Sequence, residues 1–252
     1  MDGGLLGALA DLVLPRTCAG CGVPGAMLCR RCGALLAVPH LATPRRFPEG
    51  FPPTVAAGVY AGPVRPALIA FKERGRSELA GPLGTALALA VAAVVSALPG
   101  GVAGRVRLVP VPSSAAALRT RGRDHVRELT ARAVAELRAL GMAADEARLL
   151  RRRGRLRDSA GLSAAQRRAN LAGTFVGEPV PGRRSGEVVF VLVDDVVTSG
   201  ATLTEAAGAL VAPGADDGPP VLAAVVAATP RAAPRSGTGR PVGRLSGPGE
   251  RV

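Results

Sequence analysis

Apolar residues occur along this chain in short continuous runs, separated by longer segments with helical periodicity. A continuous apolar run bounded by polar residues is typical of a strand buried on both faces, as in a parallel sheet. Strands that alternate with helices imply right-handed crossovers, so the pattern predicts an α/β fold with a parallel sheet and flanking helices. The predicted strands are residues 55–60, 106–111, 188–193 and 221–229, and the clearest predicted helices are residues 64–74 and 124–140.

The ends of these predicted elements carry residues suited to them. Gly75 and Gly141 follow the two helices, where glycine commonly ends a helix in a left-handed conformation. Asp124 stands where the N-cap of the second helix is expected. Pro110 and Pro112 end the strand at 106–111, because proline cannot donate a hydrogen bond to a sheet.

Residues 79–104 contain no charged side chain and therefore raise the question of a membrane span. Glycine and proline near both ends of this stretch restrict the predicted helix to residues 85–98. A helix of about 14 residues is too short to cross a bilayer. We therefore predict a buried, Ala-rich helix that packs closely on the sheet, with a membrane span as the alternative.

Composition divides the 252-residue chain into three parts. Residues 1–40 combine a short amphipathic helix with a cysteine-rich segment, and a proline-rich linker connects them to the predicted α/β domain at residues 54–230. Residues 231–252 contain mainly Pro, Gly, Ser and Arg, which predicts a disordered tail. Asp2 and Asp11 do not suit a secretion signal, so we expect a cytoplasmic protein.

Two Cys-x2-Cys pairs near the N-terminus contain all 4 cysteines of the chain. Four thiolates at this spacing predict a tetrahedral structural zinc (Zn²⁺) site, without an open position for catalysis. Two disulfides in an exported protein are the alternative, and the spacing fits an iron–sulfur cluster less well. The predicted ligands are Cys18, Cys21, Cys29 and Cys32.

Two adjacent carboxylates, Asp194 and Asp195, follow the apolar run at 188–193 and precede a turn rich in small and hydroxyl residues. Backbone N–H groups of such a turn, at the start of a helix, can bind a phosphate. The carboxylates would repel a phosphate, so we interpret them as acceptors for hydroxyl groups of the same ligand. A phosphate with two neighbouring hydroxyls indicates a ribose 5-phosphate. The turn consists of Thr198, Ser199, Gly200, Ala201 and Thr202.

This segment, VVFVLVDDVVTSGAT at 188–202, resembles the phosphoribosyl-diphosphate (PRPP) signature of type I phosphoribosyltransferases. Ser199 takes the place of the second Thr in Thr-Thr-Gly-x-Thr and keeps the hydroxyl. The resemblance implies a type I phosphoribosyltransferase-like sheet that binds PRPP or a nucleotide phosphate. It also implies Mg²⁺, which would bridge the ribose hydroxyls and the diphosphate. A core strand followed by a capped helix, with no ligand, is the alternative.

Other segments are similar to the ComF competence family, which combines a four-cysteine knuckle with a PRPP signature. They are LIAFKERG at 68–75, LVPVP at 108–112 with the arginines after it, and GLSAAQRRANL at 161–171. The resemblance implies that Lys72, Arg119 and Arg121 meet the diphosphate. It also implies a role in DNA uptake during natural transformation, beside an uptake ATPase or helicase.

The chain departs from this family where many members have Gly-Phe-Asn-Gln and this chain has Gly122, Arg123, Asp124 and His125. We interpret Asp124 as a helix cap and His125 as a surface residue, with a ligand role as the alternative. No aromatic residue near the acidic motif in the sequence suits stacking of a nucleobase. An active phosphoribosyltransferase of nucleotide metabolism or salvage, which would transfer phosphoribosyl to a nitrogen acceptor, is therefore the alternative function. A PRPP or nucleotide sensor would share the same site.

The chain is strongly basic, with a formal net charge of +13 at pH 7, and Lys72 is its single lysine. This charge favours anionic partners. Aromatic residues make up only 2%, so base stacking contributes little, and single-stranded DNA would bind mainly through phosphate contacts. An Arg-rich loop is the candidate surface, with a solvated loop as the alternative. Its residues are Arg148, Arg151, Arg152, Arg153, Arg155 and Arg157.

Overall fold

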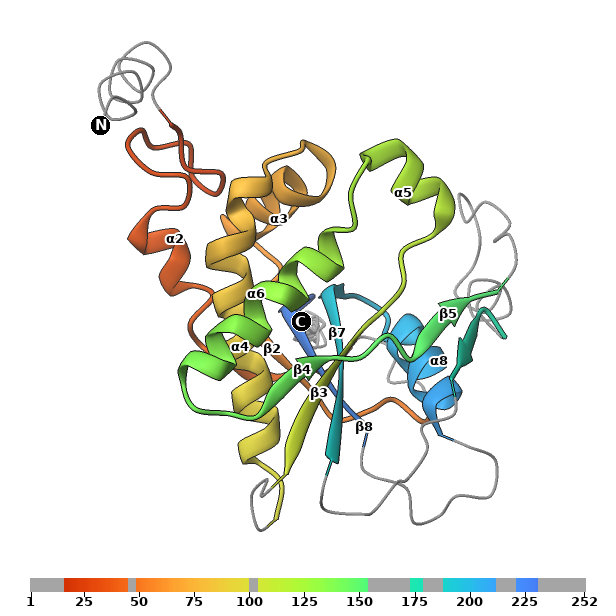
Figure 1. Ribbon diagram of the computed structural model, residues 1–252. Coiled ribbons are helices and arrows are strands. Elements are labelled where there is room, and N and C mark those ends of the chain that lie inside the picture. The colour runs from red at the N-terminus through yellow and green to blue at the C-terminus, as the bar shows by residue number, and fades with distance from the viewer. Residues whose placement is uncertain are drawn as a thin grey trace, which may run out of the picture.

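The structure is a computed structural model and describes residues 16–44, 49–99, 104–153, 173–178, 188–211 and 221–230 (Figure 1). These residues form an α/β fold with a mostly parallel sheet, flanked by helices and preceded by the four cysteines, as predicted. Some sequence predictions lie outside the described residues. These are the N-terminal amphipathic helix, the disordered tail at 231–252, the family-like block at 161–171, and Arg155 and Arg157 of the Arg-rich loop.

Within the described residues, six strands form one sheet in the spatial order β1-β2-β8-β7-β3-β4. The edge strand β1 is antiparallel to β2, and the other neighbouring pairs are parallel. The central strands β7 and β8 are largely buried on both faces, which explains their continuous apolar sequences. The strands are β1 (His40–Leu41), β2 (Thr54–Val59), β3 (Arg105–Pro110), β4 (Ala144–Glu146), β7 (Val188–Val197) and β8 (Val221–Ala228).

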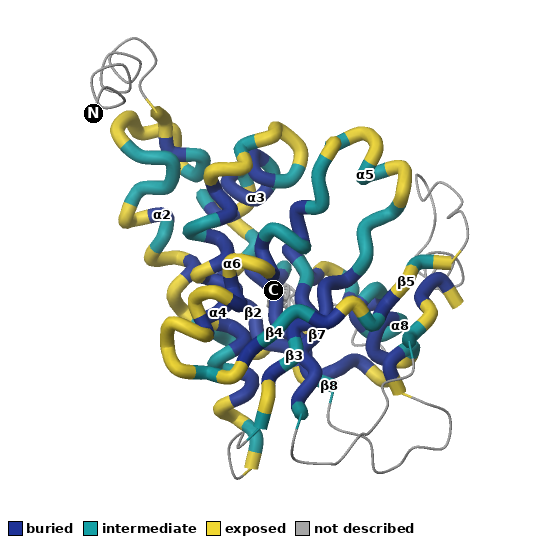
Figure 2. The backbone as a smooth tube through the Cα atoms, viewed as in Figure 1, coloured by how far each residue is buried: buried dark blue, intermediate teal, exposed yellow. Residues whose placement is uncertain are grey.

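Helices cover both faces of the sheet, and Figure 2 shows the buried residues concentrated in the strands between them. α3, α4 and α6 pack on one face through a core that includes Leu68, Leu87 and Leu129. α8 packs on the other face, where Phe190 and Leu203 are buried. The helices are α3 (Val64–Glu73), α4 (Ala80–Ser96), α5 (Ala115–Arg121), α6 (His125–Ala139) and α8 (Ala201–Leu210).

The predicted ends of the elements agree with the structure to about one residue, apart from two cases. Asp124 is the N-cap of α6, and its side chain accepts a hydrogen bond from the backbone N–H of Arg127 at 3.3 Å. Gly75 and Gly141 have positive φ angles of 67° and 80°, as expected after a helix. The first exception is β7, which continues past the predicted end at residue 193 to Val197.

The second exception is the uncharged helix α4, which is longer than the predicted 85–98. It begins at Ala80, directly after a 3₁₀ turn at Ser77–Leu79 (η1), and includes Pro82. Proline is tolerated there because the N–H groups of a first helical turn have no intrahelical acceptor. Among the described residues, Ser77–Ser96 is the one helix long and apolar enough to cross a membrane, with a mean hydropathy of 1.9. However, 61% of its most apolar window is buried inside the protein, in agreement with a core helix.

Three short parts of the fold are not predicted by the pattern of apolar residues in the sequence. β1 lies in the predicted linker, and β5 (Leu150–Arg152) pairs with β6 (Phe175–Gly177) in a separate antiparallel ribbon. α5 has no buried residue, so its sequence carries no amphipathic periodicity. A cap does mark its start, because the Ser114 hydroxyl accepts a hydrogen bond from the backbone N–H of Ala117 at 3.1 Å.

The strand order creates a switch point at the carboxyl edge of the sheet. After β3 the chain reaches β4 through α6 on one face, whereas after β7 it reaches β8 through α8 on the other. β3 and β7 are parallel neighbours, so the chain leaves their carboxyl ends in opposite directions. Ligands of open α/β sheets bind at such points. The topology therefore indicates a site at the ends of β3 and β7.

The cysteine segment, residues 16–38, packs directly on the edge of the sheet and contains the short helix α2 (Arg30–Ala34). The backbone N–H of Val38 donates to the carbonyl of Ala57 in β2 at 3.3 Å, and Leu36 is buried in the core. At Gly58 the approach is so close that a Cβ atom would lie 2.4 Å from the carbonyl oxygen of Leu35. The absence of a side chain at residue 58 therefore allows this contact.

We predict that Gly58→Ala lowers the free energy of unfolding by about 1–3 kcal/mol, because the added methyl group must displace the Leu35 carbonyl. Gly81→Ala, in the first turn of α4, is the control. A Cβ atom at Gly81 meets nothing within 4 Å. Alanine there favours the helix by up to about 1 kcal/mol. Urea denaturation followed by circular dichroism measures both variants, and a Gly58→Ala protein as stable as the wild type would contradict the close contact.

Candidate functional site

The acidic pair, Asp194 and Asp195, lies near the carboxyl end of β7, at the switch point. Each carboxylate accepts a hydrogen bond from the following backbone N–H. The N–H of Asp195 donates to Oδ1 of Asp194, and the N–H of Val196 donates to Oδ1 of Asp195, both at 2.8 Å. One oxygen of each carboxylate is thus bound to the local backbone, and the other is available to surrounding groups.

Asp195 is 3% exposed and pairs with side chains from two helices. Its Oδ2 lies 2.7 Å from Nζ of Lys72 on α3 and 3.3 Å from Nε2 of His125 on α6. Burial by itself would raise the pKa of Asp195, but the hydrogen bond from His125 and the charge of Lys72 outweigh burial and hold this pKa well below its usual range. Burial would lower the pKa of Lys72, but the charge of Asp195 raises it instead. At neutral pH, Asp195 is therefore ionised.

Asp194 has a different environment, because no cation among the described residues forms an ion pair with it. Burial, followed by the negative charge of Asp195, raises the pKa of Asp194 well above its usual range. An ionised carboxylate in this position is unfavourable without a partner. A ligand with hydroxyl donors would supply that partner.

The predicted phosphate turn connects β7 to α8. Gly200 is the N-cap of α8 and has a φ of 82°, a left-handed conformation that favours glycine. A Cβ atom at this residue would lie 2.9 Å from the ring of Phe51. The first N–H groups of α8 have no intrahelical acceptor and lie at the positive end of the helix dipole. The turn therefore has the backbone geometry that suits an anion.

A cavity of about 470 Å³ opens at this edge of the sheet. The loop after β3, residues 111–114, forms one wall, and the end of β7 forms another. This volume suits a small phosphorylated molecule. The predicted ribose and phosphate residues that line it are Asp194, Asp195, Thr198 and Thr202. The remaining turn residues, Ser199, Gly200 and Ala201, lie between the two threonines and do not line the cavity.

The three predicted diphosphate residues have different positions. Lys72 and Arg121 line the cavity, whereas Arg119 is exposed on α5 and does not. Arg121, the last residue of α5, lies with its Nε 3.3 Å from Oε2 of Glu73. Lys72 is already paired with Asp195. The structure therefore brings two of the three cations together with the acidic pair.

The Arg-rich segment is partly a strand and not only a loop. Arg151 and Arg153 are exposed, and Arg151 forms an ion pair with Glu178. Arg152, between them, points the other way and lines the cavity. Its guanidinium lies 5.4 Å from the centre of the Phe175 ring. The alternation of side chains along β5 thus assigns Arg152 to the cavity and its two neighbours to the surface.

The prediction that His125 is a surface residue is wrong, because its side chain is 2% exposed and lines the cavity. Helical spacing could have revealed this position. His125 lies four and eight residues before Leu129 and Ala133, which are both buried on α6. The polar character of histidine concealed its place on the buried face of the helix.

Tyr60 is the single tyrosine of the chain and also lines the cavity. It directly follows β2, and its backbone N–H donates to the carbonyl of Ala228 at 2.7 Å. Tyr60 is far from the acidic motif in the sequence, and the parallel pairing of β2 with β8 brings it to the site. An aromatic ring is therefore present at the cavity, whereas Phe190, the aromatic residue next to the motif in the sequence, is buried in the core.

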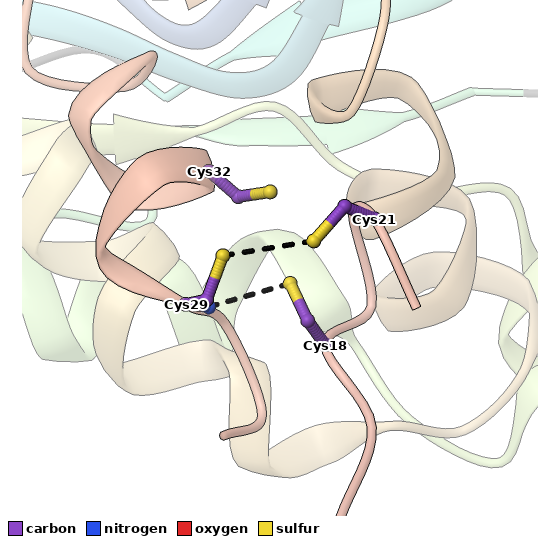
Figure 3. Close-up of side chains that lie close together, drawn as sticks. All are labelled: Cys18, Cys21, Cys29 and Cys32. Atoms are coloured by element: carbon purple, nitrogen blue, oxygen red, sulfur yellow. Dashed lines mark hydrogen bonds between the residues drawn. The ribbon is translucent and has the colours of Figure 1, made fainter. Parts of the chain in front are cut away.

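The four cysteine sulfurs converge (Figure 3), with all Sγ atoms within 4.8 Å of one another and no disulfide between them. The Sγ atoms of Cys21 and Cys29 are 3.6 Å apart, and the backbone N–H of Cys29 donates to Sγ of Cys18 at 3.3 Å. In a tetrahedral zinc site with bonds of about 2.3 Å, the sulfurs are separated by about 3.8 Å. The cluster can thus hold a metal such as zinc.

The surroundings of the cluster favour a thiolate at Cys18. Burial would raise its pKa, but backbone N–H groups, foremost that of Cys29, lower the pKa of Cys18 to about 6. Burial and the neighbouring cysteines raise the pKa of Cys32 far above its usual range. A divalent cation offsets the repulsion among such closely spaced thiolates. The donor set therefore fits zinc.

Comparison of the chain with protein-family models found no matching family, and comparison with curated protein sequences found no match. The interpretation of the site therefore depends on its residues and their geometry.

We predict that the purified protein contains about one equivalent of zinc and that Cys29→Ser releases it. The cysteine segment should then loosen, whereas the sheet should stay folded because it has its own buried core. Elemental analysis measures the zinc, and circular dichroism follows the fold. Metal-free protein with two disulfides, from a reducing expression host, would contradict this prediction.

We also predict that the same substitution has opposite effects at the two adjacent acids. Asp195→Asn should lower the free energy of unfolding at pH 7 by about 1–3 kcal/mol, because it removes the charge that Lys72 and His125 face. Asp194→Asn should raise it by up to about 1 kcal/mol, because it removes a carboxylate that forms no ion pair within the described residues. Denaturant unfolding measures both variants.

The pH dependence of the two variants provides the control. The raised pKa of Asp194 means that the cost of its charge decreases as the pH falls and is gone below the unfolded-state pKa of about 4. The lowered pKa of Asp195 means that its stabilisation persists down to about pH 4 and is lost only at lower pH. As the pH falls, the difference in the free energy of unfolding between Asp194→Asn and the wild type should therefore disappear before that of Asp195→Asn. Changes of the same sign at pH 7 would contradict the different environments of the two acids.

Proposed function

We propose that this protein binds PRPP or a nucleotide phosphate at a type I phosphoribosyltransferase-like site. One observation carries the proposal. The acidic pair and both threonines of the turn line a single cavity, and that cavity lies at the switch point of a parallel sheet. The sequence motif and the topology thus point independently to the same place.

The phosphate end of the ligand would lie against the turn before α8. Thr198 and Thr202 line the cavity there and offer hydroxyl donors. The first N–H groups of α8 add backbone donors and the positive end of the helix dipole. Neutral donors of this kind bind a phosphate without requiring a lysine or arginine in the turn itself.

The ribose would lie over the acidic pair. Asp194 needs a partner for its charge, and two neighbouring hydroxyls supply donors for it. Asp195 is held in place by Lys72 and His125 and offers a second, ionised acceptor. Mg²⁺ would be held with PRPP through oxygen ligands and would offset the negative charge of the diphosphate.

The diphosphate end of the ligand would face the cations that line the cavity. Arg121 and Arg152 line the cavity, and within the described residues Arg152 forms no ion pair with a carboxylate. A guanidinium can bind a diphosphate through two parallel hydrogen bonds. Burial lowers the pKa of Arg152, and an anionic ligand would stabilise its charged form.

For the biological role we propose a cytoplasmic, ComF-like protein that serves DNA uptake beside an uptake ATPase or helicase. The order of the features supports this, since a four-cysteine cluster that can hold zinc precedes a PRPP-like site. Among the described residues of the Arg-rich segment, Arg148, Arg151 and Arg153 are exposed and could contact single-stranded DNA. Such contacts to phosphates would be sequence-tolerant and weakened by salt.

An active phosphoribosyltransferase is the second candidate, and Tyr60 is the observation that favours it. A nitrogen atom of the acceptor would attack C1 of PRPP, and the C1–O bond to diphosphate would break with release of diphosphate. The protein would contribute positioning and charge stabilisation. The Tyr60 ring in the cavity could stack on an aromatic base.

Calorimetry with PRPP and Mg²⁺ tests the proposal. Wild-type protein should bind PRPP, and Asp195→Asn should weaken binding by about 1.5–3 kcal/mol, the range for hydrogen bonds to charged groups. Thr198→Ala should weaken it less, because backbone N–H groups still hold the phosphate. Arg119→Ala is the control and should bind like the wild type, because Arg119 does not line the cavity.

The same titrations separate the candidate functions. Release of diphosphate on addition of a purine or pyrimidine base would favour the transferase, and binding without release would favour the binding protein. If the wild type binds neither PRPP, ribose 5-phosphate nor any nucleoside monophosphate, the proposed site is wrong.

A further inference from the structure

A chain of polar contacts crosses one wall of the cavity through His125. Its Nε2 lies 3.3 Å from Oδ2 of Asp195, and its Nδ1 lies 3.1 Å from Nη1 of Arg121. These contacts extend on one side to Lys72, whose Nζ lies 2.7 Å from Oδ2 of Asp195. On the other side they extend to Glu73, whose Oε2 lies 3.3 Å from Nε of Arg121. The imidazole is buried, so water does not replace these partners.

The partners of His125 define its tautomer. A guanidinium has only donors, so Nδ1 must accept the hydrogen bond from Arg121. In a neutral imidazole the proton then resides on Nε2, where it can be donated to the carboxylate of Asp195. In this tautomer the ring accepts from Arg121 on one side and presents its N–H to Asp195 on the other.

Packing fixes the ring in this orientation. His125 is the first residue of α6, and its ring makes an edge-on contact with Phe71, with the centroids 6.2 Å apart. The guanidinium of Arg123 covers Phe71 at 4.4 Å from the ring centre. The imidazole is thus held by its apolar neighbour as well as by its hydrogen bond with Arg121 and its close contact with Asp195.

The position of α5 depends on this series of polar contacts. No residue of α5 is buried, so apolar packing contributes little to holding it. Arg121, at its C-terminal end, contacts His125 and Glu73, and these are polar contacts to α6 and α3. Ala117 and Arg121 of α5 both line the cavity. A shift of this helix would therefore change the wall of the cavity.

We infer that His125 is a positioning residue, which holds the Asp195 carboxylate and the Arg121 guanidinium at a fixed separation before a ligand binds. The carboxylate on β7 and the guanidinium at the end of α5 thus keep the same relative position. The consequence for PRPP rests on the proposed function, whereas the arrangement itself is a property of the free protein.

Three variants test this role. His125→Gln keeps an acceptor for Arg121 and a donor for Asp195, His125→Leu removes both, and His40→Leu is the control. His40 is the other of the 2 histidines, and its ring Nδ1 lies 3.2 Å from a local carbonyl, that of Val38. If His125 positions these groups, the His125→Gln variant should keep the contacts to Arg121 and Asp195 that the His125→Leu variant loses.

The ligand-free readouts are imidazole ¹⁵N resonances and hydrogen exchange. The wild type should show His125 protonated at Nε2 and not at Nδ1, with His40 as the reference signal. Amide exchange in α5 should be about tenfold or more faster in His125→Leu, as expected for loss of hydrogen bonds to charged groups. His125→Gln and His40→Leu should stay within about threefold of the wild type.

The binding readout uses PRPP with Mg²⁺. His125→Leu should bind about tenfold or more weakly, and His125→Gln should recover most of this loss. A proton on Nδ1, or a glutamine variant as impaired as the leucine variant, would overturn the inference. If the wild type does not bind PRPP, the proposed function fails, while the tautomer and the exchange in α5 still decide the role of His125.

Discussion

The ion pair between Lys72 and Asp195, with His125 beside it, is the interaction on which the site depends. Lys72 lies on α3, His125 on α6 and Asp195 on β7, so one carboxylate connects two helices to the central strand. A buried charge of this kind is stable only when its partners are in place. The arrangement of the carboxyl edge therefore depends on the packing of both helices on this face of the sheet.

The acidic pair shows how neighbouring residues of one type acquire different properties. Asp195 lies in contact with a lysine and a histidine, whereas Asp194 forms no ion pair within the described residues, and their pKa values shift in opposite directions. A protein selected for stability alone would not retain an unpaired, half-buried carboxylate. Residues that break a local rule without compensation are expected at functional sites, because a ligand supplies the missing partner.

Much of the fold follows from the sequence. Continuous apolar runs predict β2, β3, β7 and β8, because strands buried on both faces need no polar side, and the caps at Asp124 and Gly141 mark the ends of α6. Elements held by few apolar contacts are missed. α5 buries no residue, β1 and the β5–β6 ribbon are short, and the start of α4 is obscured by Pro82. Apolar periodicity reports burial, so it cannot detect elements that bury little.

The sequence by itself determined the local chemistry, namely four cysteines at metal-binding spacing and two acids before a hydroxyl turn, because these residues are neighbours in the chain. Only the tertiary structure decided which distant groups join them. Strand order brings Tyr60 and the loop after β3 to the acidic pair, and helix packing buries His125 against Asp195. Pairing across a parallel sheet depends on the paths of whole helices, and no local pattern encodes these paths.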